Sequence, residues 1–464
     1  MNKQTLVFVL YCYLIGNHWC VQDAVLQWNA VMLQVSANDL DPTIVSLPDQ
    51  KSSTQASRAF AIVHAAIHDA VNTFSKKFQP YLSYESSRGI KTNKQLQQAV
   101  EAAIGQAAND TLCQLYPKQK YLITFALQSF LQGIPAGRAK RNGIKVGRKI
   151  AKKILISREN DGSNQTITYT PINAVGYHQE DPLHPNQNFS VPYWGKVRPF
   201  VLKNGAQFRA SAIVGTTIQS RLAYLKTSTF LSNYNEVKAI GSKTSSTRTA
   251  DQTEIGIFWG YDEQPKIGSS PKLFNQATRA IAMTKGNTLI ENARLFALIN
   301  IALADASIAC WDSKYYYSFW RPIIGIRNAN KIGSKKLVED PNWEPLGSAV
   351  DFGNATQFTP PFPTYTSSHA ALGGATFQIL RRFYGTDDIA FQFQSDEYDG
   401  ETINDKGKTR PVRIRQYKSL TQAEKEVFHS RIYIGVHWRL DQEQGQKQGT
   451  QLANYAFDKI LLPS

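Results

Sequence analysis

The sequence predicts an all-α protein made of two packed four-helix-type bundles. Segments in which apolar side chains recur with helical spacing dominate the 464 residues, and they occur in two halves of similar length. Hydrophobic residues make up 42% of the chain, which excludes wholesale disorder and is enough for large cores. We expect an N-terminal bundle over residues 24–240 and a C-terminal bundle over residues 241–464, which begins with a polar stretch at 241–249.

The first residues have the pattern of a secretory signal. Lys3 precedes an apolar run at residues 6–16, which is too short to cross a bilayer as a helix. We therefore predict a signal peptide over residues 1–23 and a secreted, extracellular protein, with an uncleaved interfacial anchor as the alternative. No other stretch of 18 apolar residues is evident, so no stable membrane insertion is expected. Cys113 and Cys310 would remain after cleavage, either paired or as free thiols.

Four helices are predicted in the N-terminal half, at residues 58–74, 96–115, 121–131 and 136–156. The last of them is strongly basic, which is typical of a solvated helix surface, although docking to a membrane or a polyanion is an alternative. The net charge of +16 is accompanied by no nucleic-acid recognition motif, so no nucleic-acid partner is expected. Residues 161–199 lack periodicity and predict a long irregular loop, and loops of this length are often functional.

One pair of histidines in the first predicted helix has the spacing of zinc ligands. His64 and His68 lie four residues apart, so they share a helix face, and Asp69 follows directly. No third ligand is evident, and the glutamate of a metalloprotease helix is missing. We therefore interpret the two imidazoles as structural, hydrogen-bonded between helices.

In the C-terminal half, helical spacing predicts helices over residues 271–309, 368–384, 421–438 and 441–460, with an irregular connection at 340–363. Three short stretches of this half contain cations, serines and histidines. The residues are Lys314, Arg321 with Pro322, Ser367, Ser368, His369, Arg431, His437 and Asp441. Two guanidiniums and an ammonium can neutralise about three negative charges, as a bound tetrahedral oxyanion requires. Serine hydroxyls and amides at a helix N-terminus add donors, and histidines add a nucleophile or ligand and an acid–base group.

Each stretch also has an ordinary explanation. Lys314 and Arg321 could be surface charges, Ser367 could simply cap a helix, and Arg431 with His437 could serve packing. The joint pattern, in this order and with this spacing, resembles the signature of the vanadium-dependent haloperoxidases. Those enzymes share a superfamily with type 2 phosphatidic-acid phosphatases and bacterial class A acid phosphatases. The surrounding residues, including Pro360-Pro-Phe-Pro and Ile434-Gly-Val-His-Trp-Arg439, are similar to the fungal chloroperoxidase branch.

The resemblance implies one vanadate per chain and a role for each matched residue. His437 would bond to vanadium, while Lys314, Arg321 and Arg431 would hold the equatorial oxygens. The Ser367 hydroxyl and the Ser368 amide would complete these contacts. His369 would hydrogen-bond the apical oxygen and shuttle its proton when peroxide enters, and Lys314 would polarise the peroxide. The catalytic residues would therefore be His369, His437 and Lys314.

Three further expectations follow from the resemblance. Phe362 and Trp311 would line a halide pocket of the chloroperoxidase type, which favours chloride competence over bromide alone. The family usually has Pro-Ser-Gly-His where this chain has Thr366-Ser367-Ser368-His369, so a positive φ at Ser368 would cost about 1–2 kcal/mol. An upstream acid should orient Arg431, and the candidates are Asp251, Glu254 and Asp262.

The first functional hypothesis is thus a secreted vanadium-dependent haloperoxidase with hydrogen peroxide and halide as its substrates. The alternative is an acid phosphatase or phosphotransferase that forms a phosphohistidine at His437. A third hypothesis is an oxyanion-binding protein without turnover. The length of the chain favours the haloperoxidase hypothesis, because phosphatases with this motif are generally much shorter.

Overall fold

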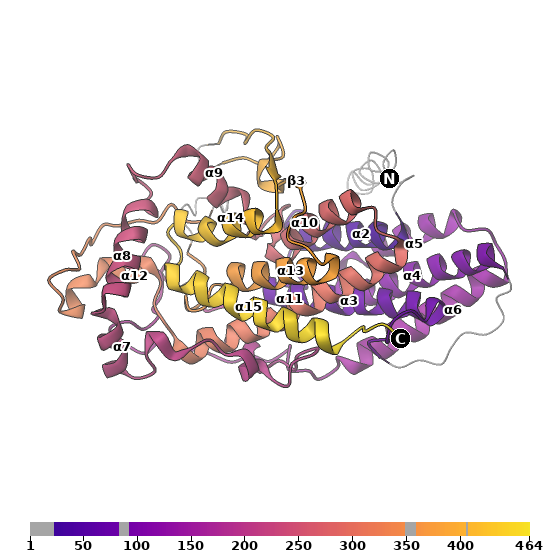
Figure 1. The fold of residues 1–464 in the computed structure, drawn as a ribbon, viewed down its shortest axis with the longest axis horizontal. Helices are drawn as coiled ribbons and strands as arrows, with labels where there is room; N and C mark the ends of the chain where they lie inside the picture. Colours follow the sequence, from indigo (N-terminus) through magenta and orange to yellow (C-terminus); the bar gives the residue numbers. More distant parts are fainter. Residues whose placement is uncertain (1–22, 83–91, 349–358, 405–406) are drawn as a thin grey trace. The chain divides into compact units, whose positions relative to one another are not determined.

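The computed structural model describes residues 23–82, 92–348, 359–404 and 407–464, and the predicted signal peptide lies outside this part of the chain except for residue 23. The described residues are mainly α-helical, which confirms the predicted fold class (Figure 1). Their α-helices are α2 (Ala24–Asp39), α3 (Ser53–Ser75), α4 (Asn93–Leu115), α5 (Lys120–Gln132), α6 (Arg138–Ser157), α7 (Ile218–Leu225), α8 (Ser228–Ile240), α9 (Ala250–Phe258), α10 (Ser270–Lys285), α11 (Leu289–Tyr317), α12 (Pro322–Arg327), α13 (Ser368–Tyr384), α14 (Leu420–Tyr433) and α15 (Arg439–Lys459).

Four short strands form two antiparallel pairs among the described residues. Asp262 lies opposite Ser269 in the first pair, and Phe391 lies opposite Tyr417 in the second. The strands are β1 (Asp262–Gln264), β2 (Gly268–Ser269), β3 (Phe391–Gln394) and β4 (Ile414–Tyr417). The first pair begins at Asp262, one of the acids predicted to orient Arg431.

The long predicted helices are observed, with two differences at glycines. The segment 271–309 is two helices, because the chain turns at Gly286, where φ is +64°. The segment 421–438 ends as a helix at Tyr433, since Gly435 adopts φ +77°. Helices α2, α7, α8, α9 and α12 were not predicted. Most of these are short, and tertiary packing rather than amphipathic spacing stabilises them.

Helix α11 is long and apolar enough to cross a membrane by length and composition, yet every residue of its apolar window is buried inside the protein. It is a core helix.

The chain forms two compact units, and each of them combines segments that are far apart in the sequence. One unit comprises the described residues within 1–161, 275–304 and 456–464, and the other comprises the described residues within 162–274 and 305–455. Hydrogen bonds explain why residues 275–304 return to the first unit: the Asn29 side chain donates to Asn275, and Arg279 donates to the carbonyl of Leu26.

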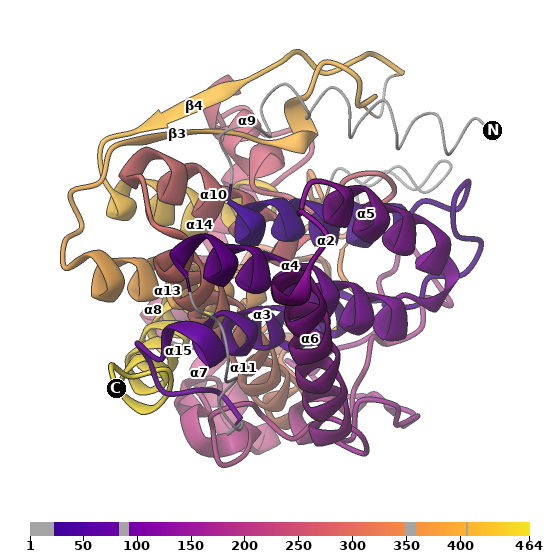
Figure 2. The ribbon, with the colours of Figure 1, turned by 90° about the vertical axis from the view of Figure 1, so that its right-hand side faces the viewer.

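In the first unit, α4 and α6 pack closely along small residues (Figure 2). A Cβ at Gly143 would lie 2.2 Å from the carbonyl oxygen of Ala99, so only glycine allows this approach. The exposed side of α6 carries basic side chains, as expected for a solvated face.

The two histidines of α3 also belong to this unit. His64 is buried, stacks on Phe296 at 5.4 Å and hydrogen-bonds Asn29 through Nε2 at 2.9 Å. His68 Nδ1 lies 3.1 Å from Asp69, whose carboxylate accepts from backbone amides. In the part of the chain that the structure describes, no group of three or more His, Cys, Asp or Glu side chains could hold a metal ion. The hydrogen bonds agree with the structural interpretation.

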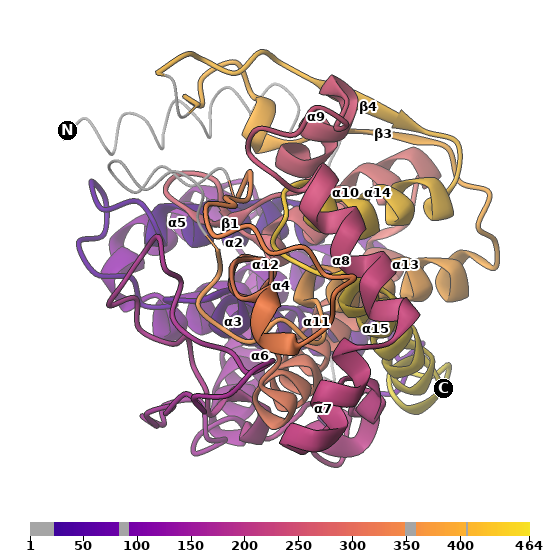
Figure 3. The ribbon, with the colours of Figure 1, turned by 90° about the vertical axis from the view of Figure 1, so that its left-hand side faces the viewer.

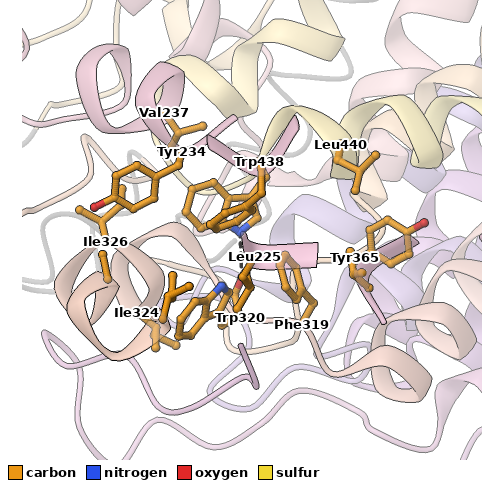
Figure 4. Packing of buried hydrophobic residues seen from close by; sticks show 14 of the residues in the cluster. Leu225, Tyr234, Val237, Phe319, Trp320, Ile324, Ile326, Tyr365, Trp438 and Leu440 are labelled. Atoms are coloured by element: carbon orange, nitrogen blue, oxygen red, sulfur yellow. Dashed lines mark hydrogen bonds between the residues drawn. The ribbon is translucent and has the colours of Figure 1, made fainter. Parts of the chain in front are cut away.

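In the second unit, α13 packs beside α14 and α15, and α8 packs against α12 (Figure 1, Figure 3). An aromatic cluster forms much of its core (Figure 4). Trp438 stacks on Tyr234 at 6.2 Å, and its Nε1 donates to the carbonyl of Trp320 at 3.0 Å. Trp320 and Trp438 directly adjoin Arg321 and His437 in sequence, so the core anchors both of these site residues.

Candidate active site

Lys314 lies in the last turn of α11 with its side chain wholly buried. Its Nζ donates to the carbonyl oxygens of Pro363, at 2.9 Å, and Thr364, at 3.2 Å. Burial lowers the pKa of Lys314 to about 7. A neutral lysine amine has two N–H donors, and both donors of the Lys314 amine are already used by the two carbonyls. Protonation therefore adds a third donor together with the positive charge.

Arg321 immediately precedes α12 and is also wholly buried. Its Nε donates to the carbonyl of Phe362 at 2.9 Å, and its Nη1 donates to the carbonyl of Val436 at 2.8 Å and to His437 Nε2 at 2.9 Å. Its Nη2 has no hydrogen-bond partner among the described residues. Burial lowers the pKa of Arg321 to about 9, so the guanidinium remains mainly charged at neutral pH.

Arg431 lies near the end of α14 and is held by an acid from β1. Its Nη2 donates to both carboxylate oxygens of Asp262 at 2.8 Å. Within the described residues, its Nε and Nη1 have no partner. Asp262 is thus the acid that orients Arg431, whereas Asp251 and Glu254 form ion pairs with Arg415. The buried arginine keeps two unpaired nitrogens, with three N–H groups, for a ligand.

His437 is buried and is a neutral imidazole, because burial and then Arg321 and Lys314 lower its pKa well below the usual value. Arginine can only donate, so the contact with Arg321 makes Nε2 the acceptor and places the ring hydrogen on Nδ1. Nδ1 lies 2.9 Å from Thr364 Oγ1 and 3.2 Å from Asp441 Oδ2. The Nε2 lone pair therefore points toward the cations.

His369 lies in the first turn of α13 and is buried. Its Nε2 lies 2.7 Å from the carbonyl oxygen of Gly260, which can only accept, so Nε2 carries the hydrogen. Burial, followed by the charge of Arg431, lowers the pKa of His369 to about 4. The ring is neutral at pH 7, and Nδ1 is its basic nitrogen. Protonation of His369 at low pH would lower the pKa of His437 further, so the two imidazoles lie within electrostatic reach of each other.

Ser367 and Ser368 are at the N-terminus of α13. Ser367 is the N-cap residue, and its Oγ accepts from the Ala370 amide at 3.4 Å. Ser368 is the first helical residue and is not among the residues with positive φ, so the strain considered for this position is absent. The first-turn amides lack intrahelical acceptors, which makes this end of the helix suitable for an anion.

The two predicted halide-pocket residues contact each other and the cations. The rings of Trp311 and Phe362 lie 4.8 Å apart, and the Lys314 Nζ lies 4.9 Å from the Phe362 ring centre. Arg321 lies over the same ring at 4.9 Å. These aromatics form an apolar wall that excludes water from the two charges.

Sequence reasoning missed two supporting groups, Thr364 and the carbonyl of Gly260, and the role of a third, Asp441. Thr364 donates to Asp441 Oδ2 at 2.5 Å, and this carboxylate oxygen also accepts from the Trp438 amide. Asp441 was recognised only as part of a motif, without a role. The carbonyl of Gly260, which accepts from His369, has no signal in the sequence because any residue has a carbonyl.

Cys113 and Cys310 are both free thiols. Cys310 lies within the site region, where its Sγ is 3.4 Å from Thr366 Oγ1. Burial raises the pKa of the Cys310 thiol, so it remains protonated.

The fold and the site define a helical protein with a buried candidate site for an oxyanion. The site contains three cationic side chains and two neutral histidines. Two domain descriptions match the chain: "Vanadium chloroperoxidase N-terminal domain" over residues 18–193 and "VCPO second helical-bundle domain" over residues 294–462. The vanadium chloroperoxidase of Curvularia inaequalis is 36% identical over 230 residues, which cover 42% of this chain and 37% of that protein.

Solved structures have the same fold. A bacterial vanadium-dependent iodoperoxidase matches with a TM-score of 0.71 and 22% identity, over 94% of this chain and 96% of that one. A bacterial vanadium-dependent chloroperoxidase, in its apo form, matches with a TM-score of 0.67 and 15% identity, over 90% and 95% of the two chains. Together with the two domain matches, these findings place the chain in the vanadium haloperoxidase family. The curated relative is matched over little more than a third of its length.

Proposed function

We propose that this protein is a secreted vanadium-dependent haloperoxidase that oxidises chloride or bromide with hydrogen peroxide to hypohalous acid. The balanced reaction is H2O2 + X− + H+ → HOX + H2O. The observation that carries the proposal is the buried contact between the Arg321 guanidinium and the Nε2 lone pair of His437, with Lys314 and Arg431 nearby. Family membership adds independent support.

The residues present fit a bound vanadate. Arg321 Nη2 and Arg431 Nε and Nη1 are buried donors that lack partners within the described residues, so an oxyanion would satisfy them. Lys314, the Ser367 hydroxyl and the Ser368 amide would hold further oxygens, and His437 Nε2 would supply the one nitrogen ligand. Vanadate, when bound, supplies Lewis-acid chemistry that activates peroxide without a change of its own oxidation state.

The chain's own groups then have distinct tasks. Lys314, Arg321 and Arg431 neutralise the negative charge inside a site that excludes water, where electrostatic stabilisation is strong. His369 Nδ1 accepts the proton that peroxide loses on entry and returns it to the departing water. Asp441 and Thr364 hold the hydrogen of His437 on Nδ1, so Nε2 carries a lone pair, which would bond to vanadium in place of its present contact with Arg321. Phe362 and Trp311 form the wall along which the halide approaches.

The test begins by stripping the protein with phosphate and a chelator and then adding orthovanadate. We expect peroxide-dependent halogenation of a diketone to appear, and chloride and bromide are compared as substrates. Hydrolysis of a phosphate monoester with no halogenation would instead favour a phosphatase that uses His437 as its nucleophile. Binding of vanadate without either activity would favour an oxyanion-binding protein.

A further inference from the structure

Beside the oxyanion site lies a small cavity whose walls contain several buried polar atoms without partners. Its lining includes His178, Asp181, Thr359 and Arg321, with apolar walls from Phe189 and Pro360. Both ring nitrogens of His178, Thr359 Oγ1 and Asp181 Oδ2 have no hydrogen-bond partner among the described residues. Unpaired buried polar atoms are costly, and here they line one space, which is the pattern of a binding site for a polar molecule.

Backbone pairing places this cavity next to Arg321. The long loop predicted at residues 161–199 pairs here with the segment that follows Lys314: Tyr177 forms a bridge with Phe319, and the His178 amide donates to the carbonyl of Ser318 at 2.9 Å. On the other side of the bridge, the Trp320 amide donates to the carbonyl of Gly176 at 3.1 Å. The loop thereby carries His178 to a cavity that Arg321 also lines.

The His178 ring is held in place and is neutral. It is 3% exposed and makes an edge contact with Phe189 at 5.4 Å. Burial, and then the charges of Arg321 and Lys314, lower its pKa well below the usual value. A neutral imidazole offers one donor and one acceptor. It therefore suits a neutral ligand that both donates and accepts hydrogen bonds.

Size and charge narrow the choice of ligand. The free space admits about one or two non-hydrogen atoms, so an organic ring does not fit. A halide would be attracted by Arg321, but the carboxyl groups of Asp181 and Glu180 in the lining disfavour an anion. Hydrogen peroxide is neutral and small, and it has two donors and two acceptors for the unpaired atoms.

We propose that this cavity is a hydrogen peroxide site beside the oxyanion site, with His178, Thr359 and Asp181 as its binding residues. Peroxide held there contacts Arg321, whose other groups face His437. The proposal rests on the proposed haloperoxidase function for its biological role, but the binding itself does not require vanadate.

Kinetics with the vanadate-loaded protein provide the first test. In His178→Phe, which keeps a ring but removes both nitrogens, the KM for peroxide should rise about tenfold, as expected for lost hydrogen bonds. Thr359→Val should raise it less, and His178→Gln, with one donor and one acceptor, should recover part of the affinity. The KM for halide should not change in these variants. His429→Phe, on α14 and outside the cavity, is the matched control.

Crystals of the vanadium-free protein provide the second test, which is independent of activity. After a soak in hydrogen peroxide, we expect density for two bonded oxygens within hydrogen-bond distance of His178, and its loss in His178→Phe. An unchanged peroxide KM in His178→Phe, or a single water at every peroxide concentration, would overturn the proposal. Peroxide density in a protein that oxidises no halide would instead show that the proposed function fails while the site stands.

Discussion

At the scale of single residues, donor-only and acceptor-only neighbours determine which nitrogen of each site histidine carries the hydrogen. Arg321 makes His437 Nε2 an acceptor, and the carbonyl of Gly260 makes His369 Nε2 a donor. One histidine therefore presents a lone pair to the cations, and the other keeps Nδ1 as a base. This difference supports the ligand role proposed for His437 and the proton-transfer role proposed for His369.

The two histidines should respond differently to removal. His437→Ala should abolish halogenation and weaken vanadate binding, because the proposed nitrogen ligand is lost. His369→Ala should lower kcat by about 10²–10⁴-fold, the usual contribution of general acid–base catalysis, with a smaller effect on vanadate affinity. Vanadate titration and steady-state kinetics measure both effects. Halogenation that persists in His437→Ala would refute the assignment of the ligand.

Lys314 should make oxyanion binding depend on pH. Its pKa in the free site is about 7, and a bound anion must raise it, so binding takes up a proton above pH 7. Affinity should then fall by up to about tenfold per pH unit as the pH rises above 7. Lys314→Gln has no such group, so its affinity should be lower at pH 7 and vary less with pH. Parallel vanadate titrations of both proteins cancel the ionisation of vanadate itself.

At the scale of elements, α13 and α15 approach closely because glycines line their contact. A Cβ at Gly449 would lie 2.0 Å from the carbonyl oxygen of Ala371, and one at Gly445 would lie 2.5 Å from that of Ser367. The same helices position His369 at the start of α13 and Asp441 near the start of α15. The close packing of α13 and α15 therefore sets the distance between the N-terminus of α13 and Asp441, which supports His437.

Gly449→Ala should disturb both stability and the site. The added methyl group meets backbone, which cannot rotate away, so the helices must separate at a cost of about 1–3 kcal/mol in the free energy of unfolding. The affinity for vanadate should fall together with the free energy of unfolding. Denaturant unfolding and vanadate titration measure the two effects. Gly133→Ala, whose Cβ would meet only ordinary contact at 3.5 Å, is the control and should leave both unchanged.

A second feature at the scale of elements is the turn at Gly260 and Tyr261, which leads into β1. Glu397, a buried carboxyl, accepts from the Tyr261 amide at 3.2 Å and is paired with Arg410 at 2.6 Å. Burial raises the pKa of Glu397 to about 8. The neighbours of Tyr261 are Gly260 and Asp262, which hold His369 and Arg431. One buried pair thus supports the partners of two site residues.

At the scale of the whole molecule, burial of neutral histidines links stability to pH. Burial lowers the pKa of His64 to about 3, below the ordinary value of 6.5. The unfolded chain therefore binds a proton that the folded chain does not, and the stabilisation is complete above pH 6.5 and lost as the pH falls toward 3. His178, His369 and His437 have the same sign of shift.

His64→Gln should make the protein less sensitive to acid. Glutamine does not titrate, so the slope of unfolding free energy against pH between 6.5 and about 3 should decrease by up to about 1.4 kcal/mol per pH unit. Denaturant unfolding at several pH values measures this slope, and the cost of the substitution at pH 7 cancels in it. An unchanged slope would mean that His64 titrates normally. His429→Gln, at a half-buried position on α14, should change the slope less.

Much of the fold and of the site was predictable because local patterns carry the information. Apolar spacing predicted α3 to α6, and the bounds of α13 agree with the predicted 368–384. The matched motif predicted the seven residues from Lys314 to His437 that the structure brings together. The return of residues 275–304 to the first unit was not predictable from spacing, since it depends on contacts such as that between Asn29 and Asn275.

The sequence by itself determined the helical class, the family and the identity of the charged and histidine residues, because residue type and local spacing suffice for these. Only the tertiary structure decided which acid orients Arg431, which nitrogen of each histidine is the acceptor, and that His178 lies beside Arg321. The physical reason is that hydrogen-bond direction and burial arise between segments far apart in the chain, and backbone groups such as the carbonyl of Gly260 leave no trace in residue type.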